Sequence, residues 1–263
     1  MKRIRVIRVA LSVAILLVTS VMVWLGHADD VARCQLTLNL AALSLGALLA
    51  WFAATLLVGR VYCSSVCPLG TLQDFAAWLD KRIHHHGKGN YHFTPSNDRI
   101  RYLTLLLVAV GLTAGDRYTI MAPRMLDPVQ LFNTTVGLGG AGDLLVYGIF
   151  GVILALIILV GILWMVWKGG GRTFCNTICP VGTVLGTMSR VSLYRLDINT
   201  DLCIGCNLCE KECKCQCINS VEHTIDVSRC VMCMNCAASC PADAIKFTTT
   251  RHRLSTPLMQ PTA

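Results

Sequence analysis

The stretch "GRVYCSSVCPLGT" at 59–71 returns 112 residues later as "GRTFCNTICPVGT" at 171–183. Each copy contains the motif Cys-x-x-x-Cys-Pro, and each follows a long apolar run. Two side chains at positions i and i+4 lie on one face of a helix, so the two cysteines of each copy are expected to be neighbours. The repetition indicates a duplicated structural unit.

The composition is that of an unusually apolar chain. Of the 263 residues, 54% are hydrophobic and 14% are charged, and the mean hydropathy is +0.57. These values predict a membrane protein rather than an ordinary soluble domain. The net charge of +8 does not indicate a nucleic-acid partner, because the positive residues flank apolar runs and no basic stripe is interleaved with aromatic residues.

Four apolar segments are candidates to span a bilayer, which requires about 20 apolar residues. They cover residues 6–25, 36–59, 102–115 and 144–167. Placing the N-terminus, residues 60–101 and everything from Lys168 onward on one side gives that side 20 of the 23 Lys and Arg residues. The positive-inside rule makes this side cytoplasmic. We therefore expect a multi-pass protein of the bacterial inner (cytoplasmic) membrane with both termini in the cytoplasm.

The expected fold is mainly α: a four-helix transmembrane bundle of two parallel two-helix repeats, followed by an α+β ferredoxin-like domain. The predicted domains are a four-span membrane domain at 1–190, with motifs at 63–68 and 175–180, a two-cluster ferredoxin domain at 191–250, and a tail at 251–263. The first apolar segment, which follows "MKRIRVIR", has a cleaved signal peptide as its alternative interpretation.

Two cysteine runs indicate iron–sulfur clusters. Both follow the pattern C-x2-C-x2-C-x3-C, and the second is followed by Pro241. This pattern binds [4Fe–4S] clusters, and in two-cluster ferredoxins the fourth cysteine of each run ligates the other cluster. The predicted ligands are Cys203, Cys206, Cys209 and Cys240 for one cluster, and Cys230, Cys233, Cys236 and Cys213 for the other.

Other roles for these cysteines fit less well. Zinc sites typically show separated Cys or His pairs rather than two sets of three cysteines, and disulfides are disfavoured in a reducing compartment. The first run departs from the pattern, because no proline follows Cys213 and two extra cysteines, Cys215 and Cys217, come after it. Cys217 could replace Cys213 as a ligand.

Four predicted spans, two Cys-x-x-x-Cys-Pro motifs on the cytoplasmic side and a C-terminal two-cluster ferredoxin together resemble the NapH-type membrane quinol dehydrogenases of periplasmic nitrate reductase systems. These proteins are related to the membrane half of NosR proteins. The resemblance implies oxidation of membrane quinol and delivery of electrons through iron–sulfur clusters to other redox subunits of a respiratory complex. None of the seven histidines lies in a predicted span, so we expect no haem.

The repeated motifs supply a second group of candidate site residues: Cys63, Cys67, Cys175 and Cys179. Parallel repeats are related by an axis along the membrane normal, which would bring the two motifs together. We interpret the four cysteines as a redox relay and leave open whether they hold a metal ion, an additional cluster or a dithiol. An alternative function is a redox maturation protein that reduces a metal or disulfide on a client, and a third is a structural anchor for other iron–sulfur subunits.

Overall fold

The computed structural model describes residues 2–24, 45–84, 89–95, 97–113 and 156–249. In chain order its first part contains the helices α1 (Lys2–Trp24), α4 (Leu45–Val58), α5 (Val61–Ser65), α6 (Pro68–His84) and α7 (Asp98–Thr113). Residues 156–165 are helical and continue into a π-helical turn, η2 (Val166–Gly170), followed by α11 (Thr173–Thr177) and α12 (Pro180–Ser189). The remaining elements are β1 (Tyr194–Ile198), α13 (Leu208–Lys211), β2 (Ile218–Asn219), β3 (Thr224–Ile225), α14 (Asn235–Ser239) and β4 (Ile245–Thr249).

The two sequence repeats fold in the same way. Gly59 ends α4 and Gly171 ends η2, both with positive φ angles, +82° and +52°, which a residue without a Cβ adopts at little cost. A short helix then carries the first cysteine, α5 in one copy and α11 in the other. The proline after the second cysteine stands at the first position of α6 or α12, where its missing N–H costs nothing.

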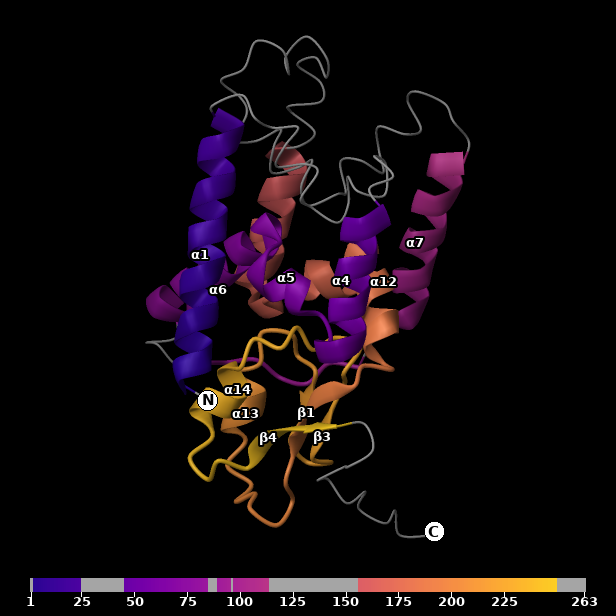
Figure 1. Cartoon of the computed structure of the whole chain (residues 1–263). Helices are drawn as coiled ribbons and strands as arrows, with labels where there is room; N and C mark the ends of the chain where they lie inside the picture. Colours follow the sequence, from indigo (N-terminus) through magenta and orange to yellow (C-terminus); the bar gives the residue numbers. More distant parts are fainter. Residues whose placement is uncertain (1, 25–44, 85–88, 96, 114–155, 250–263) are drawn as a thin grey trace.

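The contacts between elements repeat as well. The helix α1 packs on α5 and α6, and α7 packs on α11 and α12 in the same way. Each repeat also reaches across to the other, because α4 contacts α12 while η2 contacts α6. Figure 1 shows α5 between α1 and α4, and α12 between α4 and α7. The two copies therefore form one interlocked helical unit.

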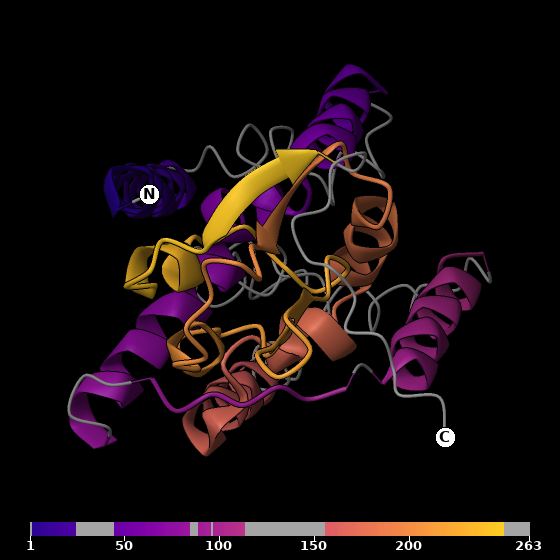
Figure 2. The same ribbon diagram turned by 90° about the horizontal axis from the view of Figure 1, so that it is seen from below.

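The C-terminal part is small and rich in cysteine. Its strands form two antiparallel pairs, β1 with β4 and β2 with β3, and in the first pair Ile198 lies opposite Ile245. Both isoleucines are buried, together with Ile218 and Leu196. Figure 2 shows this part covering the centre of the helical unit, with α1, α4 and α7 around the edge.

The expected transmembrane bundle is not what the structure shows. Within the described ranges, no helix has both the length and the apolar character needed to cross a bilayer. Within these ranges the helices α4 and α7 have 14 and 16 residues, where about 20 are required. The helix α1 has 23 residues, but Lys2, Arg3, Arg5 and Arg8 occupy its first two turns. The predictions of a four-helix transmembrane bundle and of a multi-pass inner-membrane location were therefore wrong.

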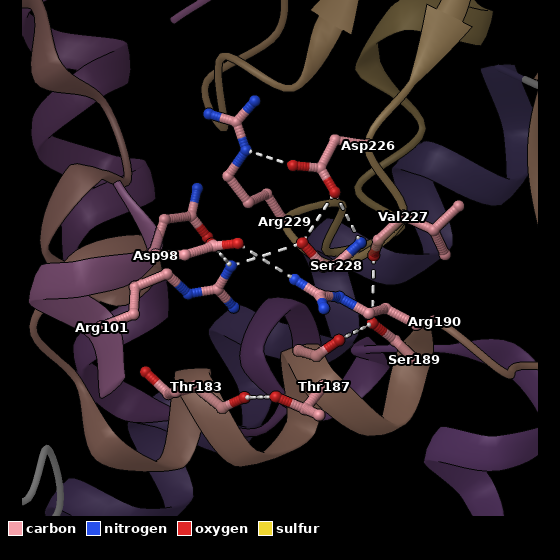
Figure 3. A network of polar contacts seen from close by, with 12 residues as sticks. Asp98, Arg101, Thr183, Thr187, Ser189, Arg190, Asp226, Val227, Ser228 and Arg229 are labelled. Carbon is pink, nitrogen blue, oxygen red and sulfur yellow. Dashed lines mark hydrogen bonds and ion pairs between the residues drawn. The ribbon is translucent and has the colours of Figure 1, made fainter. Parts of the chain in front are cut away.

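A buried polar network joins the helical unit to the cysteine-rich part (Figure 3). The hydroxyl of Ser189 at the end of α12 donates to the carbonyl of Val227 at 3.0 Å. Arg101 of α7 is 1% exposed and donates to the hydroxyl of Ser228 at 3.3 Å, while Arg229 pairs with Asp226 at 2.7 Å. The loop 226–229 is thus held against both α7 and α12.

Candidate iron–sulfur and cysteine sites

One pocket gathers the four cysteines that the sequence assigns to the first cluster. Cys203, Cys206, Cys209 and Cys240 all line it, together with Gly205. Gly205 has a φ of +69°, which lets the loop between the first two cysteines turn tightly. Burial raises the pKa of the Cys209 thiol to about 11, and the other three cysteines of the group add to this effect. Four mutually interacting thiols around one pocket suit a group that takes four cysteine ligands.

The cysteines assigned to the second cluster are close enough to interact with one another. Cys213, Cys233 and Cys236 are buried. The Sγ atoms of Cys213 and Cys217 are 3.5 Å apart, so the structure brings both alternative ligands to the same place. A hydrogen bond from the Cys217 thiol, helped by backbone N–H groups, lowers the pKa of Cys213, and the same bond raises the pKa of Cys217. The thiolate is the ligand form of cysteine.

The segment around the extra cysteine, Cys215, connects the cysteine-rich C-terminal part to the second repeated motif. Its side chain is 4% exposed, and its carbonyl accepts from the amide nitrogen of Asn176 at 3.1 Å. The adjacent Lys214 carbonyl accepts from the backbone N–H of Arg172 at 2.9 Å. The segment 213–217 is therefore docked directly onto the second motif.

The structure brings the two motifs together, and two arginines join them reciprocally. Arg60, which precedes the first motif, donates to the carbonyl of Cys175 at 3.1 Å. Arg172, which precedes the second motif, donates to the carbonyl of Cys63 at 2.6 Å. Both arginines are 0% exposed. Each motif is thus held by the arginine of the other copy.

Two glycines allow this close approach. A Cβ at Gly70 would lie against the carbonyl oxygen of Cys63, and one at Gly182 would lie against that of Cys175. Both contacts would be closer than any van der Waals separation permits. The glycines therefore keep each short cysteine helix packed against the helix that follows it.

The four motif cysteines are enclosed. Cys63, Cys67, Cys175 and Cys179 are each only 4–5% exposed. Burial raises the pKa of Cys175 to about 11, although the charges of Arg172 and Arg60 oppose it. Burial also raises the pKa of Cys67 and of Cys179 well above the ordinary value. As free thiols, Cys67, Cys175 and Cys179 are neutral at pH 7.

Asp74 in α6 forms ion pairs with three cationic side chains in this region. Its carboxylate pairs with Arg172 at 2.7 Å, with Lys214 at 2.9 Å and with Arg8 at 3.8 Å. Burial alone would raise its pKa, but the charges of Arg172 and Lys214 and their hydrogen bonds lower it far below the ordinary range. One carboxylate thus ties together α1, α6, the second motif and the segment that contains Cys215.

Sequence reasoning missed the arginines and Asp74 as site residues. The Gly-Arg pair at 59–60 and 171–172 was visible in the repeat, since it precedes each motif at the same distance. Asp74 and Gln73 carried no such signal, because the second copy has Gly186 and Leu185 at the equivalent positions.

Two comparisons identify the kind of protein to which these sites belong. A family described as "4Fe-4S binding domain" matches residues 40–85 and 152–199, the two repeats with their Cys-x-x-x-Cys-Pro motifs. A second family with the same description matches residues 223–246, which contain Cys230, Cys233, Cys236 and Cys240. These matches support iron–sulfur clusters in this chain.

Its homologues are ferredoxin-type proteins of the NapH and MauN type, 25–31% identical. The methylamine utilization ferredoxin-type protein MauN of Paracoccus denitrificans is 31% identical over 64% of this chain and 53% of its own length. The ferredoxin-type protein NapH of Haemophilus influenzae is 25% identical over 72% of this chain and 62% of its own length. An uncharacterized protein of Methanocaldococcus jannaschii is 25% identical over 73% of this chain and 65% of its own length.

The resemblance to NapH-type proteins is thereby confirmed. The chain spans between half and three quarters of the length of these curated relatives. No solved structure matches it.

Proposed function

We propose that this chain carries electrons from a quinol to the redox subunits of a respiratory oxidoreductase, through two [4Fe–4S] clusters and a further redox centre at the repeated motifs. A quinol releases two electrons, with its two protons passing to water, and a [4Fe–4S] cluster takes up one electron. Two clusters match such a two-electron donor. The ligands in this proposal are the eight cysteines of the two ferredoxin runs, in the pairing that the sequence predicts.

The observation that carries the proposal is the direct contact between the second repeated motif and the segment that contains ligands of the predicted clusters. Hydrogen bonds from Arg172 and Asn176 hold the segment with Lys214 and Cys215 against the second motif. The same segment contains Cys213, a ligand in the predicted second cluster. A short protein path from the motifs to that cluster is what an electron relay requires.

The burial of the motif cysteines argues against the redox maturation alternative. A client disulfide must come into direct contact with the attacking sulfur, because exchange proceeds through a mixed disulfide. At 4–5% exposure, the motif cysteines offer no such access, whereas electron transfer needs none.

Anaerobically purified protein tests the proposal. The ferredoxin runs should bind about eight irons per chain, and a quinol analogue should reduce the clusters. Replacing Cys63 and Cys175 by Ser should abolish quinol-dependent reduction while dithionite still reduces both ferredoxin clusters. Cys34→Ser is the control, since Cys34 belongs to neither motif nor run. Stoichiometric zinc without iron would refute the clusters, and normal turnover of the double variant would refute the relay.

A further inference from the structure

The loop between β1 and α13 forms an exposed end of the cysteine-rich part. In Figure 1 it reaches the lower end of the molecule, on the side away from α4 and α7. It contains Cys206, which alone among the described cysteines is exposed. Cys213, Cys233 and Cys236 of the second predicted cluster are buried. Of the predicted ligands, Cys206 is therefore the one that another protein can approach most closely.

Large apolar side chains are exposed around this cysteine. They are Leu202, Ile204, Leu208 and Val221. Ile204 lines the pocket formed by the four first-cluster cysteines and is nevertheless 68% exposed. Val221 is 74% exposed and belongs to the turn 220–223, whose two end residues line the same pocket. Apolar side chains gathered around one place mark an interaction site, whereas single ones scattered over a surface do not.

Hydrogen bonds fix the turn that presents Val221. The Oδ1 atom of Asn219 accepts from the backbone N–H of Val221 and from that of Glu222, both at 3.1 Å. The carboxylate of Glu210 in α13 accepts from the backbone N–H of Ser220 at 3.1 Å. The turn is therefore held beside α13, next to the loop that contains Cys206.

The local charge is opposite to that of the whole chain. All residues that line the pocket fall in the ranges 197–210, 218–225 and 240–245. These ranges contain five Asp or Glu residues and no Lys or Arg, although the chain has 23 Lys and Arg residues and a net charge of +8. Lys211 and Lys246 lie just outside them. This end of a basic protein is acidic.

Three of the five acidic residues are exposed: Asp201, Glu222 and Asp243. None of the ion pairs within the described ranges involves any of them. Carboxylates at the edge of an apolar patch favour a partner that presents cationic side chains in the matching positions.

We propose that this surface docks the protein that accepts electrons from the chain, and that the acceptor is a one-electron carrier with cationic side chains around its redox group. The docking surface consists of Leu202, Ile204, Leu208 and Val221 with the carboxylates of Asp201, Glu222 and Asp243. The proposal rests on the proposed function and names the kind of partner. One electron passes from the chain to the oxidised acceptor, and no proton or bond is transferred. The apolar centre excludes water, while the charged rim steers the encounter.

Carbodiimide cross-linking of the full chain to cytochrome c, a basic one-electron acceptor, tests the surface. The reagent joins a carboxylate to a lysine amine that is in contact with it. A chain with a net charge of +8 repels a basic protein on average, so a complex at low ionic strength requires a locally acidic surface. Mass spectrometry should locate the cross-links at Asp201, Glu222 and Asp243, and high ionic strength should abolish them.

The Asp201→Asn, Glu222→Gln double variant removes two of the carboxylates. After reduction with dithionite and removal of the excess, it should reduce cytochrome c about tenfold more slowly than wild type at low ionic strength. The difference should vanish at high ionic strength. The matched control is the Phe75→Lys, Val191→Lys double variant, which raises the net charge by the same two units at exposed positions outside the surface. It should slow the reaction by less than about twofold, because steering depends on charges near the docking site.

Val221→Ser tests the apolar centre, and it should weaken the complex by at least about threefold at every ionic strength. Cross-links at other carboxylates, or equal rates in the two double variants, would overturn the docking surface. Cross-links that join two copies of the chain through these carboxylates would overturn it as well, since the surface would then be a dimer interface. If a quinol analogue fails to reduce the chain while the cytochrome c results hold, the quinol step of the proposed function is refuted and the docking surface is supported.

Discussion

Asp74 stabilises the fold by meeting three cations at once. Replacing it by Asn should lower the free energy of unfolding by about 3–5 kcal/mol, since removing one member of a buried ion pair leaves the other uncompensated. Chemical denaturation followed by circular dichroism of the helices measures the loss. A loss below about 1 kcal/mol would show that solvent screens the cluster as it does at a protein surface.

The pH dependence of this loss has a definite sign. The pKa of Asp74 is lowered in the folded protein, so the stabilisation is complete above the unfolded pKa of about 3.9. It disappears as the pH falls from there toward the folded pKa. The difference between wild type and Asp74→Asn should be constant from about pH 5 to about pH 8 and should shrink below about pH 4. A difference that changes near neutral pH would contradict this assignment.

The choice between Cys213 and Cys217 is a second question at the scale of single residues. Their sulfurs are 3.5 Å apart, but only Cys213 continues the C-x2-C-x2-C-x3-C spacing. Cys213→Ser should therefore lose one cluster, about four irons per chain, and Cys217→Ser should keep both. Iron analysis with EPR of the reduced protein distinguishes the two variants. The reverse result would make Cys217 the ligand.

At the scale of elements, the packing of α5 on α6 and of α11 on α12 requires a glycine in the second helix of each pair. Gly70→Ala and Gly182→Ala would drive a methyl group into the Cys63 or Cys175 carbonyl. Forcing an extra methylene into a packed interior costs about 1–3 kcal/mol. Both variants should be destabilised by that amount in denaturant titrations.

Gly161→Ala is the matched control. Gly161 lies within the helical residues 156–165, and a Cβ there would meet nothing within 4 Å. Alanine in a helix is about 0.5–1 kcal/mol more favourable than glycine. The control should therefore gain stability while the two motif variants lose it, and equal behaviour of all three would contradict the packing argument.

At the scale of the whole molecule, the helical unit and the cysteine-rich part should unfold together. Ser189 is 0% exposed, and its hydroxyl joins α12 to Val227 (Figure 3). Ser189→Ala should destabilise both parts by about 1 kcal/mol through the lost hydrogen bond. Thr187→Ala is the comparison, because among the described residues the Thr187 hydroxyl bonds within α12, to the carbonyl of Thr183.

Thermal melts should be followed by helix circular dichroism and by iron–sulfur absorbance together. The two transitions should coincide in the wild type and move together in Ser189→Ala. Loss of the absorbance well before the helices melt would show that the two parts are independent.

The sequence by itself indicated iron–sulfur chemistry, which the family matches support. The cysteine runs predicted the cluster ligands, because three closely spaced cysteines and a distant fourth form a pattern that can be recognised without knowledge of the fold. The duplicated motif indicated a repeated unit, and in the structure Gly59 and Gly171 follow the equivalent elements α4 and η2. The apolar runs predicted membrane spans wrongly, because apolar content alone does not fix the length of a helix: among the described residues no helix is both long and apolar enough to cross a bilayer.

Only the tertiary structure decided how these pieces meet. Arg60 and the Cys175 carbonyl are 115 positions apart, and Arg172 and the Cys63 carbonyl are 109 apart. The chain must close on itself before either contact exists. Asp74 acquires its role in the same way, since the cations it binds come from α1, the second motif and the segment after Cys213. Spacing along the chain encodes ligands that a single loop can present, whereas the charge around a buried site depends on residues that only packing brings together.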